Sequence, residues 1–201
     1  MKICIFGDSI TWGSCDNAGG GWVDHLKRFF MEKDIGVYNL GISGKKTEDL
    51  IPIIKKEAEA RGAGMIIFAI GINDAQFIHS KGDYYLSESE FEENIKELYK
   101  IAREVTEKII FLGITSVDES KTCPIPWGPN KSYRNERIKK LDGIIENFCR
   151  QKDVKFIPLN DILDESELYD GIHPGVEGHV KIYERVRGEL AKDNTIIENS
   201  E

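Results

Sequence analysis

Three residues whose side chains cooperate in nucleophilic catalysis lie in short polar turns of this chain. Ser9 follows the apolar run 3–6, whereas Asp170 and His173 share a loop near the other end of the sequence. A serine hydroxyl is a weak nucleophile until an imidazole accepts its proton, and a carboxylate can fix the tautomer of that imidazole. The three types therefore predict a nucleophile (Ser9), a general base (His173) and its acidic partner (Asp170). On its turn alone, Ser9 is as well explained as a helix cap.

An acyl-transfer reaction of this kind also needs hydrogen-bond donors for the oxyanion of its intermediate. Ser9, Gly41 and Asn73 each follow an apolar run of strand type. The backbone amides of Ser9 and Gly41 and the side-chain amide of Asn73 are therefore the predicted donors. Aromatic residues near these turns either line a substrate pocket or anchor their loops, and the pocket candidates are Trp12, Phe77 and Trp127.

The elements that must position these residues are five strands alternating with helices. Apolar runs predict the strands at 3–6, 35–40, 65–70, 109–112 and 154–159. Helical spacing or capping residues predict helices at 22–33, from Thr47 onward, and at 87–107, 132–151 and 176–191. This alternation predicts one parallel α/β sheet with helices on both faces, whose strands end at a common edge. Periodicity does not give the order of the strands.

Length, charge and cysteine usage limit the class of protein. The 201 residues carry a net charge of −8 and the pI is about 5.2, which predicts no nucleic-acid partner and no attraction to an anionic membrane. No apolar run is long enough to predict a transmembrane helix. The first strand begins at once, so no leader is predicted and the expected location is cytoplasmic.

The sequence shows no linker and no repeat, so residues 1–192 are predicted to form a single domain followed by a polar tail, 193–201. The cysteines are scattered without metal-ligand spacing, and we expect reduced thiols rather than a disulfide framework or a metal site. They are Cys4, Cys15, Cys123 and Cys149. The oligomeric state stays open, with a homo-oligomer as one option.

Four short segments resemble, in order and approximate spacing, the motif blocks of the GDSL or SGNH hydrolases: Gly7-Asp8-Ser9-Ile10, Asn39-Leu40-Gly41, Gly71-Ile72-Asn73-Asp74 and Asp170-Gly171-Ile172-His173-Pro174. Ile10 stands where the family has leucine, a change that conserves volume. The resemblance implies a flavodoxin-like, three-layer α/β/α fold with a five-stranded parallel sheet. It also implies esterase or lipase chemistry without metal or cofactor, with Ser9, His173 and Asp170 as catalytic residues and Ser9, Gly41 and Asn73 as the oxyanion hole.

The function predicted from these observations is a serine esterase that cleaves carboxylic esters or thioesters of small molecules through an acyl-enzyme. Within this class, a carbohydrate O-deacetylase and a lysophospholipase or thioesterase remain open, with a slight preference for small acyl groups. Two alternatives lie outside this class. One is a flavin- or nucleotide-binding module, because Ser9, Thr11 and Gly13 resemble a phosphate loop. The other is a hydrolase fold that serves only as a binding or scaffold module.

Overall fold

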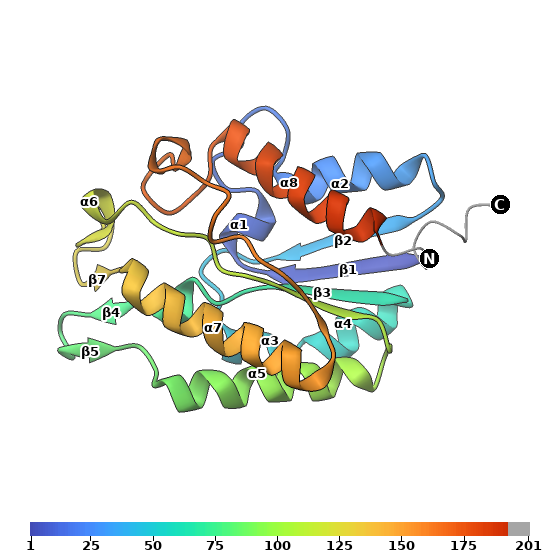
Figure 1. Ribbon diagram of the computed structural model, residues 1–201, viewed down its shortest axis with the longest axis horizontal. Coiled ribbons are helices and arrows are strands. Elements are labelled where there is room, and N and C mark those ends of the chain that lie inside the picture. The colour runs from blue at the N-terminus through green and yellow to red at the C-terminus, as the bar shows by residue number, and fades with distance from the viewer. Residues whose placement is uncertain (193–201) are drawn as a thin grey trace.

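The central feature of the computed structural model, which describes residues 1–192, is a five-stranded parallel sheet (Figure 1). The predicted tail, 193–201, lies outside the described residues. In spatial order the strands are β2 (Gly36–Gly41), β1 (Lys2–Gly7), β3 (Met65–Ala69), β6 (Ile109–Leu112) and β8 (Lys155–Ile157). This is the flavodoxin-like order, in which the chain runs outward from β1 to β2 and then returns across β1 to β3.

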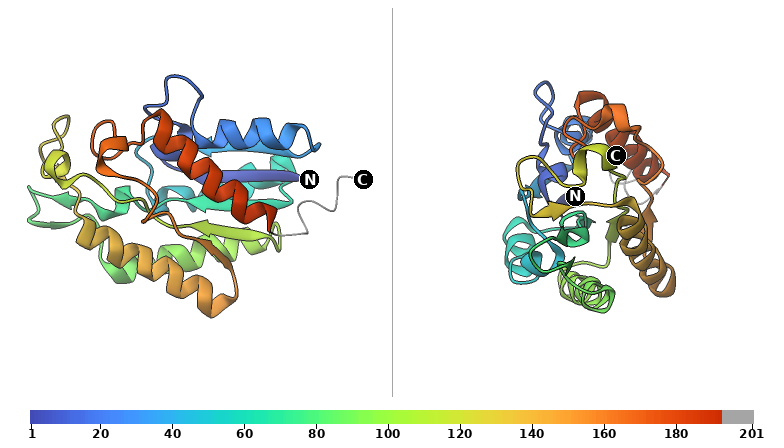
Figure 2. Two further views of the ribbon diagram at one scale, coloured as in Figure 1. Left: turned by 45° about the horizontal axis from the view of Figure 1, so that its top comes forward. Right: turned by 90° about the vertical axis from the view of Figure 1, so that its left-hand side faces the viewer.

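The middle strands are apolar because both faces of the sheet are covered. Four of the five residues of β3 are buried, and all four residues of β6 are buried. One face carries α2 (Trp22–Met31) and α8 (Val176–Ala191), and the other carries α4 (Ile54–Arg61), α5 (Glu88–Arg103) and α7 (Asn135–Lys152) (Figures 1 and 2). The three-layer α/β/α arrangement predicted from the sequence is therefore confirmed.

The helix predicted from Thr47 onward is interrupted. It forms α3 (Thr47–Leu50) and then α4, with Pro52 in the intervening turn. Proline has no backbone N–H and clashes with the preceding helical turn, which explains the break. Thr47 is suited by type to cap this helix, but Lys46 is the cap residue, and the Thr47 hydroxyl donates to Asp74 at 2.5 Å.

A second, small antiparallel sheet was not predicted. It consists of β5 (Asp83–Tyr84), β4 (Phe77–Ile78) and β7 (Lys131–Ser132), in that spatial order. Strands of two residues are too short to leave a periodic signal. Because β7 takes up Lys131 and Ser132, α7 begins at Asn135, three residues later than expected.

The remaining short elements lie in the loops around the carboxyl edge of the large sheet. They are α1 (Ser9–Trp12), α6 (Glu119–Thr122) and two 3₁₀ turns, η1 (Asn73–Ala75) and η2 (Glu165–Glu167). Within residues 1–192, none of the helices combines the length and the apolar character needed to cross a membrane.

Candidate active site

The turn between β1 and α1 presents the hydroxyl of Ser9. Asp8 caps α1, since its Oδ1 accepts a hydrogen bond from the amide of Ile10 at 2.9 Å. Ser9 is the first helical residue, so its hydroxyl is not used as the cap. A side chain at Gly7 would place its Cβ 2.0 Å from Thr11 Oγ1 and 2.4 Å from Ala69 O. Only glycine therefore permits this close turn beside β3.

His173 connects the loop after η2 to the Ser9 turn. Its Nε2 lies 2.8 Å from Ser9 Oγ, and its Nδ1 lies 2.7 Å from Asp170 Oδ2. The other carboxylate oxygen of Asp170 accepts the backbone amides of Ile172 at 3.0 Å and His173 at 2.8 Å. One oxygen of Asp170 thus shapes the loop while the other contacts the imidazole.

The environment of Asp170 favours its ionised form. Burial opposes ionisation, but hydrogen bonds from the His173 ring and from the amides of His173 and Ile172 outweigh it, and the pKa of Asp170 is lowered. An ionised Asp170 accepts the proton on Nδ1, which leaves the lone pair of His173 on Nε2, facing the hydroxyl of Ser9. The arrangement can accept a proton from Ser9.

Backbone contacts hold the His173 loop in place. The carbonyl oxygen of Gly171 accepts the amide of Asp118, the cap residue of α6, at 2.9 Å. The amide of Tyr169 donates to the carbonyl oxygen of His173 at 2.8 Å. Gly171 has a φ of +94°, and a Cβ there would lie 2.7 Å from the side chain of Lys121. Glycine is therefore needed at this position.

A cavity of about 230 Å³ opens beside Ser9 and His173. Its lining mixes polar, apolar and aromatic residues: Ser9, Ser14, Ser43, Gly44, Asn73, Gln76, Ile125, Trp127, Lys131, Tyr133, Ile172 and His173. These come from the loops that follow β1, β2 and β3 and from the two long loops of the second half. The carboxyl edge of the sheet thus gathers them, as the parallel topology predicts.

Asn73 lies in this lining with its amide held in a fixed orientation. Its Oδ1 accepts from Gln76 Nε2 at 3.2 Å and from the Tyr133 hydroxyl at 3.1 Å, and its Nδ2 donates to the carbonyl oxygen of Lys45 at 3.0 Å. An amide nitrogen carries two N–H groups, so a second donor remains for a ligand. Gln76 and Tyr133 orient Asn73. Tyr133 was among the aromatic residues that the sequence places beside these turns, whereas Gln76 was not singled out.

Gly41 does not contribute to the cavity lining. Its amide donates to Oδ1 of Asn39 at 3.0 Å, and a Cβ on Gly41 would lie 2.3 Å from the amide nitrogen of Trp12. Gly41 instead packs directly against the backbone of α1, where a side chain would not fit. The amide that the sequence assigned to the oxyanion is therefore already used within the protein.

Gly44, three residues later, lines the cavity and was missed. It has a φ of +78°, and no atom of the described part of the chain lies within 4 Å of the position a Cβ would take. Within residues 1–192, neither the amide of Gly44 nor that of Ser9 donates a hydrogen bond. The segment Asn39-Leu40-Gly41-Ile42-Ser43-Gly44 contains two glycines that could supply an oxyanion amide. The sequence prediction chose Gly41, the glycine nearer the strand.

Of the three aromatic residues predicted for the pocket, Trp127 lines the cavity. Its ring centroid lies 6.4 Å from that of His173. Trp12 is outside the lining and 60% exposed. Phe77 is also outside it and packs edge-on against His79 and Tyr84 in and beside the small sheet.

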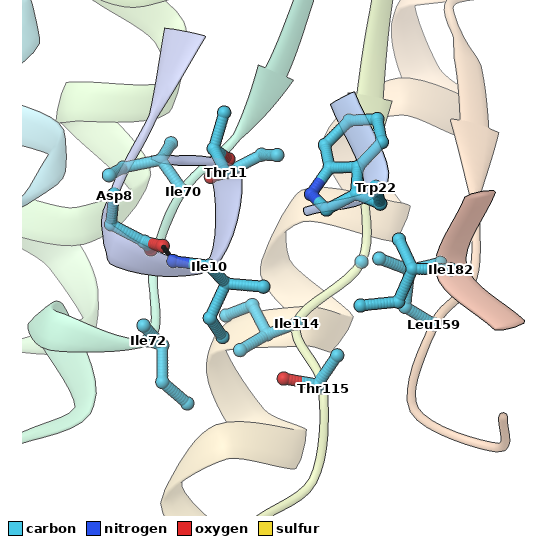
Figure 3. Close-up of a pocket in the computed structure, with 12 residues that line it drawn as sticks. Asp8, Ile10, Thr11, Trp22, Ile70, Ile72, Ile114, Thr115, Leu159 and Ile182 are labelled. Atoms are coloured by element: carbon cyan, nitrogen blue, oxygen red, sulfur yellow. Dashed lines mark hydrogen bonds between the residues drawn. The ribbon is translucent and has the colours of Figure 1, made fainter. Parts of the chain in front are cut away.

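A second cavity is lined by residues of the β1–α1 turn and of the neighbouring strand ends, and Ser9 is not among its lining residues (Figure 3). It measures about 30 Å³ and is mostly apolar, with Ile10, Ile114 and Ile182 among its lining residues. Burial raises the pKa of Asp8, at its wall, to about 6. Its volume is about that of a single water molecule. It is therefore too small for a substrate and includes neither Ser9 nor His173.

Comparison with known proteins agrees with this architecture. A family model described as the GDSL-like lipase/acylhydrolase family matches residues 5–181. No curated protein matches the chain.

Solved structures share the fold. A lipase/acylhydrolase from Enterococcus faecalis is 24% identical, with a TM-score of 0.76 and 94% of each chain covered. An acetylxylan esterase from Geobacillus stearothermophilus is 20% identical, with a TM-score of 0.73 and coverage of 94% of this chain and 93% of that one. A GDSL-like lipase from Bacteroides thetaiotaomicron is 18% identical, with a TM-score of 0.72 and coverage of 96% and 88%.

Proposed function

The chain belongs to the GDSL-like lipase/acylhydrolase family, whose members hydrolyse ester bonds, and from this premise we propose that it is a serine esterase acting through an acyl-enzyme. The observation that carries the proposal is the continuous hydrogen-bonded series from Ser9 through His173 to Asp170. The nucleotide-binding alternative has less support, because the hydroxyl of Ser9 is already paired with an imidazole and α1 has only four residues.

In the proposed reaction, Ser9 Oγ attacks the ester carbonyl carbon while its proton passes to His173 Nε2. Asp170 stabilises the resulting imidazolium through Nδ1. The tetrahedral intermediate collapses, His173 returns the proton to the departing alcohol, and the acyl group stays on Ser9. A water molecule, deprotonated by His173, then attacks the acyl carbon. As the bond from that carbon to Ser9 Oγ breaks, His173 returns the proton to Oγ, and the carboxylic acid leaves the restored enzyme.

We assign the oxyanion hole to the amides of Ser9 and Gly44 and the side-chain amide of Asn73. Gly44 replaces Gly41 in this assignment because it lines the cavity with an amide that no acceptor among residues 1–192 uses. Asn73 supports the role through its oriented amide. Donors aimed in advance at the developing charge stabilise the transition state without reorganisation.

The substrate we favour carries a short acyl group, with an acetylated carbohydrate first. The cavity is below the usual range for drug-sized ligands, roughly 300–1,000 Å³, and its lining includes Ser14, Ser43 and Gln76. Such side chains suit sugar hydroxyls, and the indole of Trp127 offers a flat face to a pyranose ring. A lysophospholipase would instead require a long apolar channel for its acyl chain.

Acyl-chain profiling tests this function. We expect the hydrolysis of p-nitrophenyl esters to be fastest for acetate and to decline as the acyl chain lengthens, and peracetylated xylo-oligosaccharides to release acetate. The same esterase assay on the Ser9→Ala variant gives the background rate. Maximal activity on decanoate or longer esters would contradict the short-acyl assignment, and no turnover across the whole panel would contradict the esterase itself.

A further inference from the structure

A free thiol lies next to the proposed base and its acidic partner. Cys15 Sγ, a carboxylate oxygen of Asp170 and a ring nitrogen of His173 all lie within 4.8 Å of one another. Each of the three residues is partly exposed, so an ion can reach them from solvent. Cys15 does not line the cavity beside Ser9, and the proposed hydrolysis gives its thiol no role. The cluster therefore combines the Cys15 thiol, a soft metal ligand, with the Asp170 carboxylate and the His173 imidazole, which the proposed ester hydrolysis uses.

Contacts on both sides of Cys15 hold its backbone. The carbonyl oxygen of Ser14 accepts a hydrogen bond from His179 Nε2 at 2.9 Å, and the amide of Ser14 donates to the carbonyl oxygen of Ser9 at 3.0 Å. After it, the carboxylate of Asp16 accepts amides of residues 18, 19 and 21. Cys15 itself has a φ of +69°. The thiol thus projects from a loop that is anchored to the nucleophile turn.

We propose that Cys15, Asp170 and His173 form an inhibitory site for a thiolate-binding divalent cation such as Zn²⁺. Zinc is bound by sulfur at about 2.3 Å and by nitrogen or oxygen at about 2.0–2.2 Å, in tetrahedral geometry. Ligand atoms in such a site lie roughly 3.3–3.6 Å apart, a spacing reached by small side-chain movements. Three protein ligands are available, and a water molecule completes the coordination. Mg²⁺ and Ca²⁺ prefer all-oxygen ligands and do not suit the site.

Binding would disable the base by changing its tautomer. The nitrogen facing Asp170 is Nδ1. Zinc takes that nitrogen, the Nδ1 proton is lost and one proton is placed on Nε2, while the thiol of Cys15 releases its proton to solvent. Zn–S, Zn–N and Zn–O bonds form, water molecules leave the hydrated ion, and one proton is released overall. With a proton on Nε2, His173 cannot accept the proton of Ser9.

Metal binding is tested without using activity. Titration of the purified protein with Co²⁺ is expected to produce a thiolate-to-cobalt charge-transfer band, which Zn²⁺ then removes. The band is expected in the wild type, in Ser9→Ala and in Cys123→Ser, a control for the other partly exposed thiol, and it is expected to be absent in Cys15→Ser and Cys15→Ala. Equal thermal unfolding of the variants shows that they fold. Absence of the band in the wild type, or its persistence in both Cys15 variants, would overturn the site.

Inhibition is the second readout, and it alone rests on the proposed esterase function. We expect Zn²⁺ to inhibit p-nitrophenyl acetate hydrolysis reversibly, with EDTA restoring the rate. Cys15→Ser should keep the basal rate and need at least about tenfold more Zn²⁺ for half-inhibition, because changes to groups that only support a metal ligand already weaken binding by roughly 10–100-fold. Equal Zn²⁺ sensitivity of Cys15→Ser and the wild type would contradict the inference. A cobalt band in a protein that hydrolyses no ester would leave the metal site standing and remove the esterase function.

Discussion

Ser9 Oγ and His173 Nε2 lie 2.8 Å apart although 164 positions separate them in the chain. Ser9 is positioned by the turn after β1, and His173 by a loop between η2 and α8. Within residues 1–192, no backbone hydrogen bond joins the Ser9 turn (8–13) to the His173 loop (168–175). The single hydrogen bond therefore joins two separately built parts of the site, and each prediction below tests one component of it.

Removal of the nucleophile should abolish ester hydrolysis. Ser9→Ala removes the only atom that forms the acyl-enzyme in the proposed mechanism, and a loss of at least about 10³-fold in kcat is expected. A fluorophosphonate probe should label the wild type and not the variant. Ser120→Ala, at a hydroxyl that donates to Asp118 Oδ1, is the matched serine control and should still be labelled. Labelling of Ser9→Ala would show that another residue is the nucleophile.

Asp170 should influence catalysis through the tautomer of His173. Asp170→Asn keeps the volume of the side chain but no longer holds the proton on Nδ1, and we expect kcat to fall by about 10²–10⁴-fold with a smaller change in KM. Ser9→Ala combined with Asp170→Asn should be about as inactive as Ser9→Ala alone, because the groups act as a unit. Steady-state kinetics measure both. An additive loss in the double variant would indicate separate roles.

The pH–rate profile should fall on the acidic side. His173 must be neutral to accept the proton of Ser9, so kcat should rise as the pH increases and then level off. The lowered pKa of Asp170 keeps its carboxylate ionised throughout this rise, because its stabilising contacts are lost only as the pH falls through that pKa. A rate that stays constant from pH 5 to 8 would contradict the role of His173.

The two glycines after β2 should respond differently to alanine. In Gly41→Ala the new Cβ meets the backbone of α1 at 2.3 Å, so we expect a lower melting temperature and reduced activity together. In Gly44→Ala the Cβ has open space but the backbone has a φ of +78°, so a loss of kcat should dominate. Asn73→Ala should lower kcat by about 10²–10³-fold and should also lower the melting temperature, because Lys45, Gln76 and Tyr133 each lose a hydrogen-bond partner. Unchanged kcat in both Gly44→Ala and Asn73→Ala would refute this oxyanion hole.

Asp74 should make the protein less stable as the pH rises from acidic to neutral values. Burial raises the pKa of this carboxyl to about 7, despite hydrogen bonds from the hydroxyl and amide of Thr47. The folded state therefore holds a proton that the unfolded state releases near pH 4, and the stability from this group is lost as the pH rises from about 4 through 7. The loss is on the order of 2–4 kcal/mol.

Denaturant unfolding of Asp74→Asn measures this effect. The variant should lose less stability than the wild type between pH 5 and pH 8, because the asparagine does not titrate. Glu104→Gln, at an exposed carboxylate paired with Lys55, is the control and should leave the slope unchanged. An identical pH dependence in wild type and Asp74→Asn would show that Asp74 is ionised throughout.

Chelators should leave the ester hydrolysis intact. Every step of the proposed mechanism is assigned to a side chain or backbone amide of this chain, and none is assigned to an ion. Dialysis against EDTA is therefore expected to give an unchanged kcat. A loss of activity that Zn²⁺ or Mn²⁺ restores would contradict the mechanism.

Much of this site could be predicted because the carboxyl ends of parallel strands meet at one edge. That rule places the turns of Ser9 and Asn73 together, and it needs only the apolar runs 3–6 and 65–70. The distinction between Gly41 and Gly44 could not be predicted in the same way. It depends on the path of the backbone after β2 and on the contact between Gly41 and α1, which are tertiary features.

The small sheet illustrates a second limit. Its strands contain two residues each, so pairing with distant segments, and not local preference, defines them. That sheet takes up Phe77, which packs there and not in the cavity. The Cys15 cluster depends on the approach of two distant loops, and scattered cysteines give no indication of it.

The division of labour within Asp170 has a consequence for how such a site can change over time. One carboxylate oxygen of Asp170 accepts the loop amides and the other contacts the imidazole of His173. The loop that carries both residues therefore fixes their relative position by itself, and the two form one structural unit. Insertions elsewhere in the long loops can remodel the substrate entrance without disturbing their mutual alignment. The catalytic geometry then depends mainly on one distance, the separation between the Asp170–His173 loop and the Ser9 turn.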